Sequence, residues 1–116
     1  MKDLVEIRAI VRLAMLDRVV HQLKEAGAPR LAVTRVHAIG AGADPAKARF
    51  SLEDGSAYAE KAQVSLICAR ERNAMYVELI CKAARTGRRG DGIVSVHPVL
   101  DVTKVRTGVA GPEALS

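Results

Sequence analysis

The apolar residues of this chain follow two alternating periods, and each change of period predicts a new element. Residues 4–12 alternate apolar and polar side chains, which predicts a β-strand with one buried face. Residues 15–26 repeat apolar side chains every three or four positions, which predicts an amphipathic helix. Gly27 and Pro29 follow this repeat, so we expect the helix to end there.

The same succession of periods occurs again after a long interruption. Residues 31–39 are rich in strand-forming side chains and predict a second strand. Residues 40–61 have no clear period and begin with small and chain-breaking residues, so we expect a long loop, which in a compact domain is usually functional. Residues 62–68 predict a third strand, and the 3.6-residue repeat that follows predicts a second helix capped by Asn73.

The last third of the chain is predicted to return to strands. The second helix is expected to end at Gly87, a position suited to left-handed backbone. Residues 93–96 predict a fourth strand that Pro98 interrupts, and residues 99–106 predict a further strand segment. Residues 107–116 contain glycine and proline and predict an irregular tail.

Strands that alternate with two helices in this order predict a single α+β domain over residues 1–116, a ferredoxin-like split βαβ sandwich with a terminal strand. The helices would cover one face of the sheet. The other face also carries apolar residues, and we expect another copy of the chain to bury them.

Composition and charge narrow the class of function. The chain has 18 basic and 13 acidic residues, a net charge of +5, which suits an anionic ligand and also ordinary solubility. The basic residues are spread along the chain and aromatic residues are few, which disfavours nucleic-acid binding. Charged residues interrupt any secretory signal, and no segment approaches the roughly 20 apolar residues of a membrane span, so we expect a cytoplasmic protein.

No residue pattern indicates a metal centre or a catalytic group. Cys68 and Cys81 lack CxxC spacing and a nearby histidine, and we interpret them as two buried thiols; a disulfide would require their Cβ atoms to approach closely. His37 and His97 are single strand histidines. Asp91 has no nucleophile placed beside it, so we expect its carboxylate to hold the adjacent turn by accepting backbone N–H groups.

The segment TGRRGDG at residues 86–92 is the strongest candidate for ligand chemistry. Its three glycines allow a ligand to approach the backbone N–H groups, and its two arginines provide fixed positive charge. Lys104 and Arg106 are two positions apart on a predicted strand, so we expect them to share a face. Together these residues suit a di- or triphosphate, although a tight surface turn with solvated arginines has the same pattern.

The run TGRRGDGIVSVHPVLDVTKVRTG resembles the C-terminal signature of the P-II nitrogen regulatory family, which reads TG-basic-x-GDG, a strand, PV, and a basic strand that ends in RTG. The N-terminal half is similar as well, with LDRV at 16–19 and VTRV at 33–36. Gly40 stands where the family's long T-loop begins, and Lys61 where it ends.

This resemblance implies a homotrimer of ferredoxin-like subunits that binds ATP, ADP or AMP in three clefts between neighbouring subunits, with no metal required. It also implies a regulator rather than an enzyme, whose T-loop docks on a membrane transporter or a metabolic enzyme. The residues that match the family's positions around the phosphates are Gly40, Gly87, Arg88, Gly90, Asp91, Gly92, Lys104 and Arg106; those around adenine are Ile10, Ser65 and Ile67; those of the effector site and T-loop root are Ala41, Gly42 and Lys61.

The chain departs from the family's pattern at positions that matter for the ligand. The T-loop root reads GAG at 40–42 instead of Gly-Arg-Gln, so the glutamine that coordinates Mg-ATP with 2-oxoglutarate is missing. Asp54 stands where some members have a tyrosine that is uridylylated, and Ile93 stands where the family has a lysine that contacts phosphate. Ser65 stands in place of the acidic residue beside adenine, and Lys104 in place of an arginine. These departures predict a preference for ADP or AMP over Mg-ATP and the loss of 2-oxoglutarate sensing. Divergent members of the family are associated with carbon uptake and carboxysomes, and some sense bicarbonate; a basic site with a changed loop is compatible with such a small anion as effector, which the sequence alone does not establish.

Two other functions share parts of this pattern. An enzyme acting on a nucleotide would need a base, a metal cluster or a nucleophile pair, and the sequence shows none. A metal-binding structural trimer of the divalent-ion tolerance type would need clustered histidine, cysteine or carboxylate residues, which are sparse. The GDG segment favours the regulatory protein over both.

Overall fold

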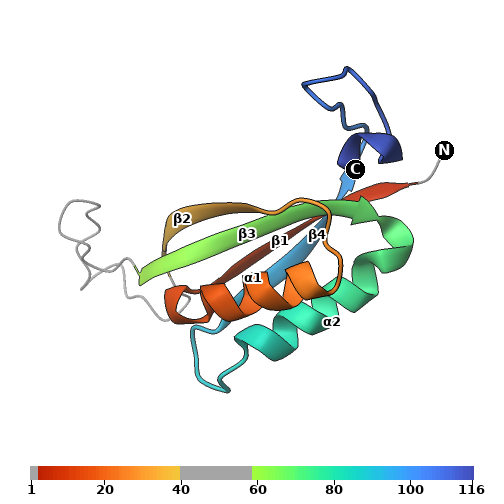
Figure 1. The fold of residues 1–116 in the computed structure, drawn as a ribbon. Helices are drawn as coiled ribbons and strands as arrows, with labels where there is room; N and C mark the ends of the chain where they lie inside the picture. The colour runs from red at the N-terminus through yellow and green to blue at the C-terminus, as the bar shows by residue number, and fades with distance from the viewer. Residues whose placement is uncertain (1–2, 40–58) are drawn as a thin grey trace.

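The computed structural model describes residues 3–39 and 59–116, which form one layer of strands and one layer of helices (Figure 1). The main elements in chain order are β1 (Leu4–Arg12), α1 (Leu16–Glu25), β2 (Ala32–Ala38), β3 (Ala59–Ala69), α2 (Asn73–Ala84) and β4 (Gly92–Val99). Short 3₁₀ turns lie at Leu13–Met15, Arg70–Arg72 and Pro112–Leu115. In the part of the chain that the structure describes, no helix is long and apolar enough to cross a membrane.

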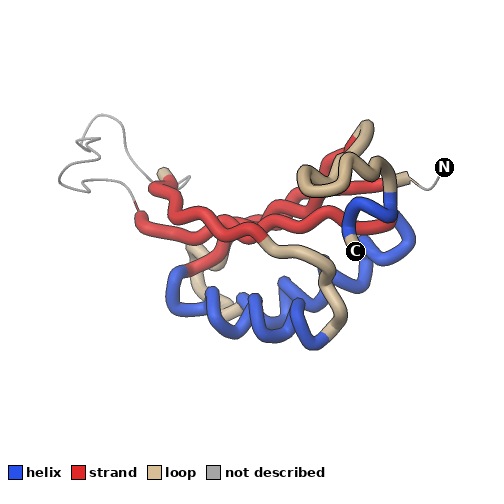
Figure 2. Tube along the Cα trace, turned by 45° about the horizontal axis from the view of Figure 1, so that its top comes forward, coloured by secondary structure: helices blue, strands red, loops and turns tan. Residues whose placement is uncertain are grey.

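The four strands form one antiparallel sheet in the order β2-β3-β1-β4, and both helices lie against the same face of it (Figure 2). The two βαβ halves interlock, because β1 and β3 are neighbours in the centre while β2 and β4 are the edges. This arrangement confirms the predicted α+β, ferredoxin-like fold.

The core lies between the sheet and the two helices. Every second side chain of β1 and β3 points to the face of the sheet that the helices cover. The apolar stripe of each helix packs against these side chains. The largest fully buried side chains are Ile7, Val11, Val19, Leu23, Val64, Cys68, Tyr76 and Ile80. Each buried Val, Leu or Ile side chain contributes about 1.5–3 kcal/mol.

The other face of the sheet is open in the single chain. Glu6, Arg8 and Ile10 project there from β1, and Ser65 and Ile67 from β3, because these positions alternate with the core residues. The apolar Ile93 of β4, which pairs with Ile10, is 68% exposed. The C-terminal segment lies over the end of this face that carries Glu6 and Ile67, so the prediction of a face without cover within the chain holds only for the rest of it.

The predicted strand at residues 99–106 is wrong. β4 ends at Val99, and the chain then turns away from the sheet into a hairpin in which Thr103 and Ala110 form an isolated bridge. Gly108 donates its backbone N–H to the carbonyl oxygen of Lys104 and has a φ of +75°, which closes the turn. Apolar and polar residues do alternate in this segment, but it bridges to the next segment of the chain rather than to the sheet.

Two strand boundaries also differ from the prediction. Pro98 lies inside β4, opposite Val5, instead of interrupting the strand. It is tolerated because β4 is an edge strand, where one missing N–H need not break the sheet. β3 begins at Ala59, so Lys61 lies in a strand and only residues 40–58 of the predicted loop stay outside the described residues.

The predicted cap at Asn73 is wrong, whereas the tail is irregular as predicted except for one short 3₁₀ turn. A 3₁₀ turn at Arg70–Arg72 precedes α2, so Arg72 occupies the cap position and Asn73 is already the first helical residue. The Oδ1 atom of Asn73 is buried without a hydrogen-bond partner among the described residues. In the tail, Pro112–Leu115 form a 3₁₀ turn whose Ala114 is buried.

The two cysteines are free thiols, Cys68 in the core and Cys81 half-buried on α2. Burial raises the pKa of the Cys68 thiol, which keeps it protonated and unreactive. The interpretation of these residues as packed thiols is confirmed for Cys68.

Candidate functional site

The glycine-rich turn between α2 and β4 is built around the carboxylate of Asp91. Its Oδ2 atom accepts backbone N–H groups from Thr86 at 2.8 Å and Gly87 at 2.9 Å, and Oδ1 accepts the Thr86 hydroxyl at 2.5 Å. The predicted role of Asp91 as the acceptor that holds this turn is therefore confirmed. Gly87 and Gly90, with φ of +85° and +93°, supply the left-handed backbone that the turn requires.

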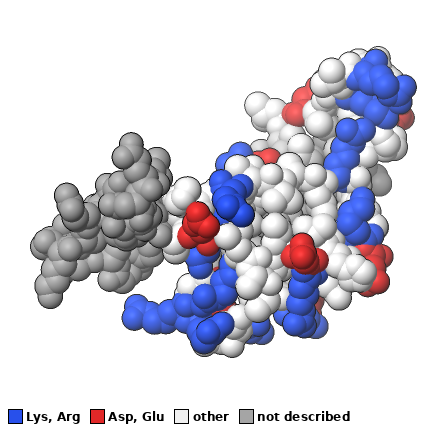
Figure 3. All heavy atoms as spheres, turned by 60° about the vertical axis from the view of Figure 1, so that its left-hand side comes forward, with Lys and Arg blue, Asp and Glu red and all other residues white. Residues whose placement is uncertain are grey.

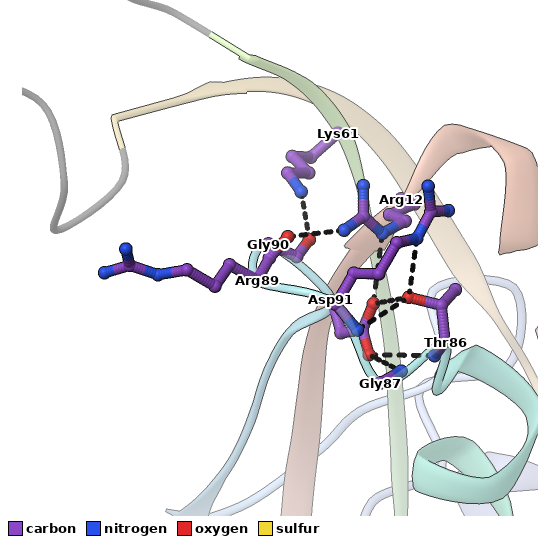
Figure 4. Close-up of polar contacts among 8 residues, drawn as sticks. Arg12, Lys61, Thr86, Gly87, Arg89, Gly90 and Asp91 are labelled. Carbon is purple, nitrogen blue, oxygen red and sulfur yellow. Dashed lines mark hydrogen bonds and ion pairs between the residues drawn. The ribbon is translucent and has the colours of Figure 1, made fainter.

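Two cations from the sheet brace the same turn from its other side (Figure 4). Arg12, at the end of β1, donates from Nε to Asp91 Oδ1 at 3.1 Å and from Nη2 to the carbonyl oxygen of Arg89 at 2.5 Å. Lys61 on β3 donates to the carbonyl oxygen of Gly90. The Arg89 side chain points away from this cluster, so its charge is presented outward.

The charge of Asp91 is strongly stabilised in the folded chain. Hydrogen bonds from the hydroxyl and backbone of Thr86 are the main cause, and the Arg12 guanidinium and the Gly87 N–H add to them, so the pKa of Asp91 lies well below its usual range. The carboxylate is ionised at every pH at which the protein is expected to work, and it anchors the turn rather than exchanging protons.

We expect Asp91→Asn to lower the melting temperature and to remove part of its pH dependence. Because the pKa of Asp91 is depressed by folding, its stabilising contribution is present above the unfolded value of about 3.9 and is lost as the pH falls below it. The difference in melting temperature between wild type and variant should be constant near neutral pH and shrink below about pH 4.

Circular dichroism melts at a series of pH values provide the measurement. Asp17→Asn, an exposed carboxylate in the first turn of α1, is the matched control, and its difference from wild type should not follow the same curve. A difference for Asp91→Asn that stays constant down to the lowest pH would contradict this role.

A second part of the site is a groove of about 920 Å³ between the sheet and the C-terminal hairpin. Ser65 and Ile67, predicted to face adenine, and Lys104 and Arg106, predicted to face phosphates, all line it. These four residues come from separate segments, β3 and the hairpin, so their meeting in one cavity is a property of the fold. The remaining lining residues are Glu6, Arg30, Leu31, Ala32, Leu66, Val102, Thr103, Val105, Ala114 and Leu115.

Lys104 already has a partner within its own chain. Its backbone N–H and carbonyl groups hold the hairpin through Val109 and Gly108, and its Nζ atom donates to the carbonyl oxygen of Ser116 at 2.8 Å. A phosphate that binds Lys104 would compete with this carbonyl. Arg106 lies on the exposed turn of the hairpin and lines the same groove.

The two parts of the site lie at opposite ends of the sheet. Gly92 pairs with Val11, whereas the groove is lined by Glu6, and the two β1 positions are roughly 17 Å apart at strand spacing. Ile10 belongs to the first part, because it lines a cavity of about 150 Å³ with Asp91 and Gly92. The predicted adenine contacts Ile10 and Ser65 line different cavities, although they are diagonal neighbours on the open face of the sheet.

Three predicted positions, Gly40, Ala41 and Gly42, lie outside the described residues. The sequence reasoning also missed residues that the structure brings to the site. Arg12 organises the turn from β1, and Thr86, which lies in the predicted segment 86–92 but was not among its predicted ligand residues, donates to Asp91. Glu6 and Arg30 carry charge into the groove, and only the alternation of β1 could have indicated that Glu6 faces away from the core.

Positive charge accompanies both parts. Figure 3 shows basic side chains gathered at the lower end of one face and on the projecting lobe above it. Among residues 3–39 and 59–116, no group of three or more histidine, cysteine or acidic side chains could hold a metal ion. The described site therefore offers cations and backbone donors, which suit an anionic ligand.

The chain is similar to known proteins over nearly its whole length. A nitrogen regulatory protein P-II of Rhizobium meliloti is 33% identical over 114 residues, covering 95% of this chain and 98% of the relative. The nitrogen regulatory protein GlnK2 of Haloferax mediterranei is 36% identical over 113 residues, covering 94% and 89%.

Solved structures show the same fold. The crystal structure of Arabidopsis thaliana PII bound to citrate matches with a TM-score of 0.80 at 26% identity, covering 97% of this chain and 92% of that one. The GlnK–ATP complex of B. subtilis matches with a TM-score of 0.79 at 23% identity over 97% of both chains. The family model for nitrogen regulatory protein P-II matches residues 4–109, and the chain belongs to that family.

Proposed function

We propose that this regulatory protein binds an adenine nucleotide, and that the nucleotide is its signal. One observation carries the proposal: Ser65 and Ile67 line the same groove as Lys104 and Arg106. An apolar wall with a hydroxyl on one side and two cations on the other suits a base with attached phosphates. The volume, about 920 Å³, is within the usual range for a small-molecule site.

The complete site is formed between two subunits of a homotrimer in this proposal. The groove supplies cations from the hairpin, and the glycine-rich turn of residues 86–92 supplies backbone N–H groups and further arginines, but both lie far apart in one chain. The open face of the sheet carries Ile10, Ile67 and Ile93, which need a cover. A neighbouring copy that packs there could bring its turn to this groove.

The site should favour ADP or AMP over Mg-ATP. Ile93, which is exposed at the start of β4, offers no charge where the turn meets the sheet. Lys104 provides one point charge rather than a bidentate fork, so the cationic groups suit a short phosphate chain. Arg88 lies on the turn, with its Nε atom 3.4 Å from the Thr86 hydroxyl, and is placed to add one more forked donor.

Nucleotide binding would be transmitted to the T-loop through Lys61. This residue donates to the carbonyl oxygen of Gly90 in the turn and lies on β3 just after the segment at residues 40–58. A ligand that shifts the turn therefore acts on the root of the loop. In the proposal the loop then docks on a transporter or a metabolic enzyme, and a small anion, bicarbonate rather than 2-oxoglutarate, modulates the response.

Isothermal titration calorimetry with ADP, AMP and Mg-ATP tests this function, each with and without bicarbonate or 2-oxoglutarate. We expect micromolar binding of ADP or AMP, and at least about a tenfold loss in Arg106→Ala, because a charged contact to phosphate is removed. Arg18→Ala, an exposed position on α1, is the control and should bind as wild type does. Absence of nucleotide binding, or Arg106→Ala binding normally, would refute the proposal.

A further inference from the structure

The groove contains one carboxylate among several cations. Arg30, Lys104 and Arg106 line it with positive charge, whereas Glu6 is the single acidic residue among its lining residues. A carboxylate that faced the phosphates would oppose binding. We infer that Glu6 reads the base of the nucleotide, accepting a hydrogen bond from the exocyclic amine of adenine, so that it selects 6-aminopurine over 6-oxopurine nucleotides.

The position of Glu6 on the sheet supports this role. Glu6 pairs with Ile67, and the next open-face position on β1, Arg8, pairs with Ser65, so Glu6 and Ser65 are diagonal neighbours on one face. Residues at such spacing are within reach of the same small ring. Glu6 is therefore beside the two side chains that define the apolar and hydroxyl wall of the groove.

A hydrogen bond to one oxygen orients the Glu6 carboxylate, and the other oxygen can accept a hydrogen bond from a ligand. Arg8 donates from Nε to Glu6 Oε1 at 2.7 Å, which fixes the carboxylate and offsets its charge. No group in the described ranges 3–39 and 59–116 donates to the second oxygen, Oε2. The Glu6 side chain is only 24% exposed, so a ligand donor that meets Oε2 would do so in a partly desolvated place.

The pair formed by Glu6 and Ser65 matches the edge of adenine. Adenine presents a donor, its 6-amino group, beside an acceptor, N1, whereas hypoxanthine and guanine present an acceptor at position 6 beside an N1–H donor. A carboxylate can only accept, so Glu6 placed against position 6 complements the 6-amino group of adenine and opposes the 6-oxygen of the other two bases. In the same orientation the Ser65 hydroxyl can donate to N1 of adenine. A 6-oxopurine would place its oxygen against the carboxylate of Glu6.

This inference rests on the proposed nucleotide site, and the experiment separates the two. ADP and IDP (inosine diphosphate) are titrated calorimetrically into wild type, Glu6→Gln and Glu6→Ala, with GDP as a second 6-oxopurine. Wild type should bind ADP at least about tenfold more tightly than IDP, because a site built to pair with a hydrogen-bonding group rejects the analogue that lacks it. In Glu6→Gln and Glu6→Ala the ratio should fall to about twofold or less.

Glu113→Gln is the matched control, since Glu113 lies outside the groove, and it should keep the wild-type ratio. Light scattering confirms that each variant has the same oligomeric state. Equal losses for ADP and IDP in both Glu6 variants, or an unchanged ratio, would overturn the role of Glu6 while nucleotide binding stands. Failure of wild type to bind either nucleotide would overturn the proposed function and this inference with it.

Discussion

Gly92→Ala should unfold the protein or leave it barely folded. An alanine Cβ at this position would lie 1.8 Å from the carbonyl oxygen of Ile10 and 2.9 Å from its carbonyl carbon, and both are backbone atoms of the central strand β1. The φ of Gly92 is also +113°, which side chains other than glycine rarely adopt. Relief would require β4 to separate from β1 where the turn enters the sheet.

The expected cost is about 4 kcal/mol or more, because a backbone clash inside the sheet cannot be relieved by rotating a side chain. A domain of this size has about 5–15 kcal/mol of stability, so the melting temperature should fall by more than about 15 °C or the transition should disappear. Thermal unfolding followed by circular dichroism measures the effect.

Gly87→Ala is the matched control for backbone strain alone. Gly87 has a φ of +85°, but an alanine Cβ there would have no atom within 4 Å, so only the left-handed conformation opposes the change. We expect a cost of about 1 kcal/mol and a shift of a few degrees. If Gly92→Ala melts as close to wild type as Gly87→Ala does, the approach of the turn to β1 is not as close as the structure describes.

The sheet and helices could be predicted because local periods report their burial directly. Val19 and Leu23 fall at the predicted helical spacing and are fully buried, and the alternation of β1 places Ile7 in the core as expected. The prediction of a strand at residues 99–106 was wrong, although it used the same alternation that predicted the other strands correctly. Alternation tells which side chains share a face, but it does not tell which segment supplies the partner strand.

Most residues of the candidate site could be predicted from the sequence, but their contacts in space could not. The glycines and Asp91 of the turn are contiguous in sequence, so a local motif was enough to find them. Arg12 and Lys61 reach the turn from 79 and 29 positions away in the chain, and no local pattern indicates such contacts. Glu6 was missed because a charged residue on a strand most often has only solvent around it.

The separation of the turn from the groove leads to the second large expected effect, which concerns mixtures of two inactive variants. Arg106→Glu should abolish nucleotide binding through the groove, and Arg88→Glu should abolish it through the turn, because each reverses a charge that the proposed site places beside phosphate. If one site takes its groove from one subunit and its turn from the next, a mixed trimer contains an interface where both parts are intact.

Refolding the two variants together at equal concentration should therefore restore binding in about a quarter of the sites, since half of the grooves are intact and half of these meet an intact turn. Calorimetry with ADP measures the stoichiometry, and each variant refolded alone is the control. The restored sites should have wild-type affinity, because their residues are unchanged. A site contained within one subunit would carry a lesion in every chain, and the mixture would then stay as inactive as its parents.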